Sequence, residues 1–296
     1  MQHDNLMEAE ARDAYWKKCH SEGRKYHERK KEFVIIPDYE PLGRIDKLEE
    51  KMGARPYHRV KEELLKMEHC REQDAPHPIL LDVGCGDGAV AAYYAQAGFD
   101  VVAFDYSEGA CQDSEATAKA LTVKFTGCGK MFVQPPIDIM DFDLSNVSLG
   151  GSERSLKSGF DCLILHEFLH QCRPSGLGRL RQRVLSLLRP DGLLFVCVKS
   201  RKHPLYGLPT HPQHSLPRKI EDHVFEFRDH RPVHYLDGRA LDELFLNPPA
   251  GADVASRIEM LWSEELEQDE RTQRKPMQIA YRPWVIYYLG RKILGK

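Results

Sequence analysis

The sequence of 296 residues lacks three features, and each absence excludes a class of protein. It has no apolar run near the ~20 residues that a membrane-spanning helix needs, and Met1 opens a charged segment without the apolar core of a signal peptide. None of its eight cysteines forms a C-x-x-C pair, so we predict free thiols rather than a disulfide framework. The formal net charge of −3 implies no global field for a polyanion. We therefore expect a cytoplasmic protein with no membrane partner.

The composition that remains is typical of a globular enzyme-sized chain. Hydrophobic residues make up 42% and charged residues 29%, which is enough apolar material for a sizeable core. The length suits one large domain, or one domain with an elaborated substrate-binding region.

One stretch organises the rest of the chain. At residues 79–88 an apolar run that contains Asp82 passes directly into a glycine turn, which is how a parallel sheet presents backbone N–H groups to a nucleotide-like ligand. A helix is predicted over residues 89–97, and a second strand over residues 100–104 ends at Asp105. The acid lies about 20 residues beyond the glycines, where a carboxylate can accept two hydrogen bonds from a ribose diol.

This Asp-Val-Gly-Cys-Gly-Asp-Gly turn, with Asp105 after it, resembles the first two motifs of class I S-adenosylmethionine-dependent methyltransferases. Gly84, Gly86 and Gly88 read G-x-G-x-G, whereas a dinucleotide dehydrogenase spaces its glycines as G-x-G-x-x-G. The resemblance implies S-adenosylmethionine as cofactor. It also implies an α/β fold: a doubly wound, mostly parallel seven-stranded sheet with an antiparallel last strand, an N-terminal helical cap and an insertion between strands five and six.

The resemblance extends over about residues 80–199 and predicts the later strands. Strands are expected at residues 131–133, 160–165, 193–198, 258–265 and 284–291, with the turn Leu-Arg-Pro-Asp-Gly leading into the fifth. We divide the chain into an N-terminal helical cap at residues 1–74 and a methyltransferase domain at residues 75–296. The substrate-binding insertion is placed at about residues 200–257.

Cofactor contacts are predicted at the glycine turn, at the ends of the next strands and in the N-terminal cap. In the resembled family, an acid and an apolar residue after the third strand hold the adenine, and Asp138 and Ile139 match them. Two prolines just before them leave Asp141 and Asp143 as alternatives. The full predicted set is Asp82, Gly84, Cys85, Gly86, Asp105, Tyr106, Asp138, Ile139, His166 and Trp16.

The segment from His166 to His170 spells H-E-x-x-H, the pattern of zinc proteases. On one helix the two histidines would share a face and bind the metal. Here the segment directly follows a predicted strand, and Glu167-Phe168-Leu169 matches the acid-apolar-Leu pattern that methyltransferases carry there. We therefore predict no metal. His166 either lines the cofactor site or acts as a base toward the substrate.

The loop after the fifth strand supplies the other predicted catalytic groups. His203 and Tyr206 lie in a His-Pro-x-Tyr-Gly stretch that is loosely similar to small-molecule and tellurite-type methyltransferases. An oxygen or nitrogen acceptor must lose a proton, so His166 and His203 are the predicted bases and Tyr206 the orienting group. A thiol, thioether or arsenic-type acceptor needs no base, and the histidines then only shape the site.

The predicted function is methyl transfer to the oxygen, nitrogen or sulfur of a small molecule by in-line displacement. One alternative is methylation of RNA or protein, for which basic residues near the N-terminus speak. Nucleic acid is disfavoured as a partner but kept open, because no Asn-Pro-Pro-Tyr-like tetrapeptide follows the fourth strand. The other alternative is a non-catalytic partner protein that keeps the fold. The sequence does not predict the oligomeric state.

Overall fold

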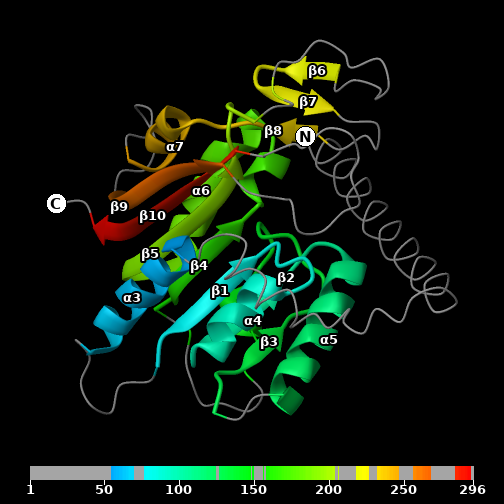
Figure 1. Cartoon of the computed structure of the whole chain (residues 1–296), viewed down its shortest axis with the longest axis vertical. Coiled ribbons are helices and arrows are strands. Elements are labelled where there is room, and N and C mark those ends of the chain that lie inside the picture. The colour runs from blue at the N-terminus through cyan, green and yellow to red at the C-terminus, as the bar shows by residue number, and fades with distance from the viewer. Residues whose placement is uncertain are drawn as a thin grey trace, which may run out of the picture.

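The computed structural model places most of residues 55–294 in a sheet with helices on both faces (Figure 1). The described residues are 55–69, 77–124, 127–147, 149, 156, 158–203, 206, 218–226, 232–246, 256–267 and 284–294. Trp16 and the boundary proposed at residues 74–75 lie outside them, so the cofactor role of Trp16 and the division into domains stay predictions. Within these ranges no helix combines the length and apolarity that crossing a membrane requires.

The main sheet has seven strands in the order β3-β2-β1-β4-β5-β10-β9. Their bounds are β1 Ile79–Val83, β2 Asp100–Phe104, β3 Met131–Val133, β4 Phe160–His166, β5 Leu188–Lys199, β9 Ser256–Glu267 and β10 Trp284–Leu294. β10 runs antiparallel to both of its neighbours, β5 and β9, and the other pairs are parallel. The predicted fold, with six parallel strands and an antiparallel last strand, is thus confirmed.

Helices cover both faces of this sheet. They are α3 Arg55–His69, α4 Ala89–Gln96, α5 Glu108–Lys124, α6 Pro174–Leu187 and α7 Gly238–Phe245, with short 3-10 helices at Leu144–Asn146 (η1) and Leu169–Gln171 (η2). Successive strand residues point to opposite faces, so Leu163 and Leu165 of β4 pack with α6 and α7, while Cys162 and Ile164 pack with α3 and α4. Two apolar cores therefore sandwich the sheet.

Local sequence explains where several of these helices begin. The buried Val60 and Leu64 recur at helical spacing in α3. Pro174 opens α6, where its missing N–H costs no hydrogen bond. The carboxylate of Asp237 caps α7 by accepting a hydrogen bond from the Ala240 N–H at 2.8 Å.

A separate three-stranded antiparallel sheet forms the insertion after β5. It consists of β6 Arg218–Glu221, β7 Val224–Glu226 and β8 Pro232–His234, and Figure 1 shows it beyond one end of the main sheet. Leu236 joins the two sheets: its N–H donates to the Lys199 carbonyl at 3.0 Å and its carbonyl accepts from the Arg201 N–H at 2.9 Å. The predicted insertion is confirmed. β6 was not foreseen, because its Arg-Lys-Ile-Glu sequence has little apolar alternation.

Gly290→Ala is expected to lower the free energy of unfolding by about 1 to 3 kcal/mol, the usual cost of overpacking. A Cβ at this bulge of β10 would lie 2.1 Å from Cγ2 of Ile258, and that side chain is too buried to move. The matched control is Gly178→Ala on the exposed side of α6, where nothing lies within 4 Å. It should raise stability by up to about 1 kcal/mol. Urea unfolding that ranked the two variants equally would contradict this packing.

Candidate active site

The glycine turn after β1 is held in a conformation that needs glycine. Gly84, Gly86 and Gly88 have φ values of 68°, 55° and 76°, in the left-handed region. The N–H groups of Gly84 and Cys85 both donate to the Phe104 carbonyl, at 2.9 and 3.0 Å. These donors serve the protein itself, so the turn offers a ligand close backbone approach rather than these two N–H groups.

Asp105 joins the glycine turn to the start of α5. Its Oδ2 accepts from the Gly86 N–H at 3.1 Å, and its Oδ1 accepts from the Ser107 N–H at 2.9 Å. The carboxylate is buried at the end of β2, where the sequence placed it, and Tyr106 follows it half-buried. Nearby, Cys85 lies 3.5 Å from the Ser114 hydroxyl, and burial raises the pKa of its thiol, which stays neutral.

Asp82 is a buried acid with an unusual environment. Only 1% of the residue is exposed, and burial, followed by the neighbouring charge of Asp105, raises its pKa to about 7. The Ala91 N–H at the start of α4 donates to this carboxyl group. Among the described residues, its Oδ2 has no hydrogen-bond partner. A buried oxygen of this kind calls for a donor from outside the protein.

The segment after β3 runs along the end of β2. The Gln134 N–H donates to the Ala103 carbonyl at 2.9 Å, and the Ile137 N–H donates to the Asp105 carbonyl at 3.0 Å. Asp138 closes a local turn by accepting from the Met140 N–H, and Ile139 lies in the apolar core. The residue bonded beside Asp105 is therefore Ile137, which sequence reasoning missed.

The H-E-x-x-H segment does not form one helix. His166 ends β4, Glu167 adopts a φ of 53°, and His170 lies in η2. The Glu167 N–H donates to the Cys197 carbonyl at 2.8 Å, which ties this bend to β5. The next side chain, Phe168, covers Gly84 so closely that a Cβ there would lie 2.6 Å from its ring. The zinc-protease arrangement on one helical face is therefore not formed.

His166 has a partner that the sequence did not reveal. Its Nε2 lies 2.8 Å from the hydroxyl of Tyr57 on α3, and Tyr57 is only 3% exposed. Burial lowers the pKa of His166, so the imidazole is neutral at pH 7. The helical spacing of α3 predicted a buried face, but no local signal distinguished this hydroxyl from an ordinary core ring.

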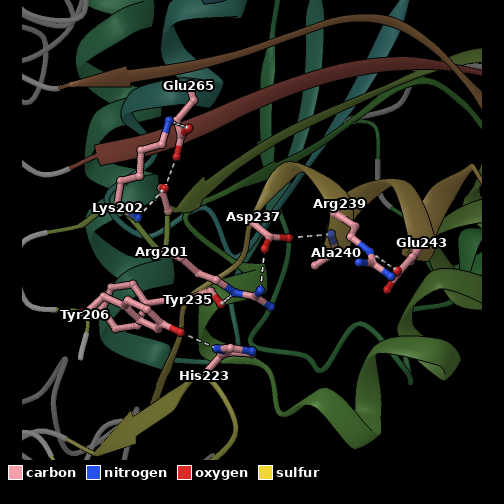
Figure 2. Close-up of polar contacts among 11 residues, drawn as sticks. Arg201, Lys202, Tyr206, His223, Tyr235, Asp237, Arg239, Ala240, Glu243 and Glu265 are labelled. Atoms are coloured by element: carbon pink, nitrogen blue, oxygen red, sulfur yellow. Dashed lines mark hydrogen bonds and ion pairs between the residues drawn. The ribbon is translucent and has the colours of Figure 1, made fainter.

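The other two predicted catalytic groups lie in an aromatic cluster of the insertion (Figure 2). The Tyr206 hydroxyl is hydrogen-bonded to Nδ1 of His223 at 2.5 Å, and its ring packs edge-on against Tyr235. His203 is buried, 5.4 Å from the Tyr235 ring, and burial together with the charge of Lys199 lowers its pKa to about 4. His223, with a φ of 62° in the turn between β6 and β7, was also missed.

Arg201 holds this cluster to the main domain. Figure 2 shows its guanidinium group between the Tyr235 carbonyl and the carboxylate of Asp237, the residue that caps α7. β8 packs beside η2, which directly follows the end of β4. The insertion therefore lies at the carboxyl edge of the parallel strands, the edge where such sheets bind ligands. The structure thus gathers the predicted groups into two sets, His166 with Tyr57, and His203 with Tyr206.

Comparison with known families agrees with this geometry. The profile described as "Methyltransferase domain" matches residues 51–248, about two thirds of the chain. The chain belongs to this methyltransferase family. The match confirms the resemblance seen in the glycine turn, and S-adenosylmethionine is the cofactor of the class. No curated protein sequence matches the chain.

Solved structures show the same fold. An S-adenosylmethionine-dependent methyltransferase from Methanosarcina mazei is 20% identical, with a TM-score of 0.53 over 77% of this chain and 97% of that one. The 1,6-didemethyltoxoflavin-N1-methyltransferase of Burkholderia thailandensis is 18% identical, with a TM-score of 0.47 over 88% and 93% of the two chains. TehB from Haemophilus influenzae is 14% identical, with a TM-score of 0.46 over 78% and 61%.

Asp82→Asn is expected to remove a pH-dependent loss of stability from the methyltransferase. An aspartate in an unfolded chain has a pKa of about 3.9, whereas Asp82 in the folded protein keeps its proton up to about pH 7. Between these values the folded state binds the extra proton, so the free energy of unfolding falls as pH rises, and the full penalty is present above pH 7. At about 1.4 kcal/mol per pKa unit, it amounts to a few kcal/mol.

Urea unfolding of the cofactor-free protein at pH 4.5 and pH 8 measures this difference. The wild type should lose more stability than Asp82→Asn between the two pH values. Asp191→Asn, in the exposed turn that begins β5, is the control and should follow the wild type. Equal pH dependence of the wild type and Asp82→Asn would show that Asp82 ionises as it does in water.

Proposed function

We propose that this methyltransferase transfers the methyl group of S-adenosylmethionine to an oxygen, nitrogen or sulfur atom of a small molecule. The observation that carries this proposal is the insertion: a small aromatic sheet, fixed by Leu236 and Arg201, lies at the carboxyl edge beside the segment that follows β4. Substrate choice is commonly built into segments at this edge. A compact cluster of tyrosines and histidines suits a small acceptor with one hydrogen-bonding group.

The residues around the glycine turn suit the cofactor. The unpartnered Oδ2 of Asp82 is an acceptor of the kind that the cofactor's ammonium group satisfies, and Asp105 with Tyr106 lies where a ribose diol is expected. The bare backbone of Gly84 and Gly86 allows close approach. When bound, S-adenosylmethionine supplies an electrophilic methyl group. The role of the chain is then to hold the acceptor in line, exclude water and accept a proton.

His166 is the base we propose for an oxygen or nitrogen acceptor. It stands at the end of β4, one residue before the bend that brings Phe168 onto the glycine turn. Because burial lowers its pKa, it is neutral at pH 7 and one ring nitrogen carries a lone pair. His203 is neutral for the same reason, but its contact with Tyr235 in the insertion favours a role in shaping the acceptor site.

The alternatives lack an observation of this kind. Methylation of RNA or protein was suggested by basic residues near the N-terminus, and these lie outside the described part of the chain. A non-catalytic partner would have no need for the glycine turn and for Asp105 bonded across it. The cytoplasmic location stays a prediction from the sequence.

The test is formation of S-adenosylhomocysteine from S-adenosylmethionine with a panel of phenols, amines and thiols. His166→Asn should lower kcat for a phenol or amine by about 10² to 10⁴, because general base catalysis is lost. Its affinity for S-adenosylmethionine should change little, and kcat for a thiol should fall much less. His77→Asn, at an exposed position, is the control. Turnover with RNA or protein but with none of the small molecules would contradict the proposal.

A further inference from the structure

Tyr57 is an unusual choice for its position in the core. Its ring packs edge-on against three aromatic rings, those of Tyr93, Phe195 and Tyr287, with centroids 5.7, 5.6 and 6.2 Å away. Phenylalanine would fill this space without bringing a hydroxyl group into an apolar core. A buried hydroxyl is costly unless it is hydrogen-bonded, and this one lies 2.8 Å from Nε2 of His166. The hydroxyl therefore points to a function at the end of β4.

The contact leaves two arrangements of protons. Either the hydroxyl donates to Nε2 and His166 carries its proton on Nδ1, or Nε2–H donates to the Tyr57 oxygen and Nδ1 carries the lone pair. Only the second arrangement leaves His166 able to accept a proton from an acceptor, because Nε2 is already engaged. This step rests on the proposed role of His166 as base.

We propose that Tyr57 is a positioning residue that accepts the Nε2–H of His166 and thereby makes Nδ1 the basic nitrogen of the methyltransferase. Helix α3 then belongs to the active site, although no residue of α3 was among the predicted site residues. Its placement is secured by the buried Val60 and Leu64 and by the ion pair between Glu63 and Arg291 of β10, at 3.2 Å.

The surroundings keep both partners of this pair uncharged. Around His166, burial lowers the pKa and outweighs the charges of Glu167 and Asp87, which raise it. Around Tyr57, burial raises the pKa of the hydroxyl, and every further titratable neighbour acts in the same direction. These neighbours are Tyr287 of β10, Cys197 of β5, Tyr94 of α4 and Glu167. A neutral phenol and a neutral imidazole are the forms that a tautomer-setting hydrogen bond requires.

The direct test is ¹⁵N NMR of the ring nitrogens of His166 in the full chain, assigned by comparison with His166→Asn. In the wild type near pH 7.5, Nε2 should carry the proton and Nδ1 should not. In Tyr57→Phe the ring should populate both neutral tautomers. It should also titrate at lower pH than in the wild type, because the imidazolium loses an acceptor. These readouts need neither cofactor nor acceptor.

Tyr94→Phe is the matched control. Tyr94 is also a fully buried tyrosine of the same core, and its hydroxyl has no hydrogen-bond partner among the described residues. Its loss should leave the His166 signals unchanged. In turnover, Tyr57→Phe should lower kcat for a phenol by about 10-fold with little change in KM, since one hydrogen bond to the base is lost. The Tyr94→Phe variant should turn over like the wild type.

Two results would overturn the proposal: a wild-type His166 with its proton on Nδ1, or a Tyr57→Phe variant whose His166 tautomer and pKa are unchanged. Failure of the proposed function has a different mark. If His166→Asn turned over phenols at the wild-type rate while the tautomer followed Tyr57, the base assignment would fall and the hydrogen bond would stand.

Discussion

The active site depends on how the end of β2 holds the glycine turn. The Phe104 carbonyl accepts two N–H groups of the turn, and the next residue, Asp105, accepts a third from Gly86. The same carboxylate accepts the Ser107 N–H at the start of α5, so one side chain fixes the spacing between a turn and a helix. Because the three glycines have positive φ, this arrangement is available only to a sequence that places glycine there.

The rest of the site is placed against this fixed point. Phe168 packs on Gly84, which brings the bend after His166 to the turn, and the Glu167 N–H ties that bend to β5. From outside the sheet, α3 brings a hydroxyl to His166, and the insertion brings Tyr206 and His203 to the same edge. A methyltransferase of this design separates its tasks: the first half of the sheet suits the cofactor, and α3 with the insertion suits the acceptor.

Local patterns predicted the parts of this architecture that are local in the chain. The glycine turn, Asp105 and the buried strands were found from spacing and apolar runs, because their geometry is set within about ten residues. The contact between Tyr57 and His166 joins residues 109 positions apart, and nothing near either residue encodes it. Ile139 shows a related limit, since motif spacing placed it at the cofactor, whereas the path of the chain after β3 brings Ile137 beside Asp105.

The most direct test of the account is calorimetric binding of S-adenosylmethionine and S-adenosylhomocysteine to the wild type and to Asp105→Ala. The account predicts micromolar binding of both by the wild type. It predicts loss of that binding in the variant, since the carboxylate both orders the glycine turn and faces the expected ribose. A folded wild type that bound neither compound would contradict the account.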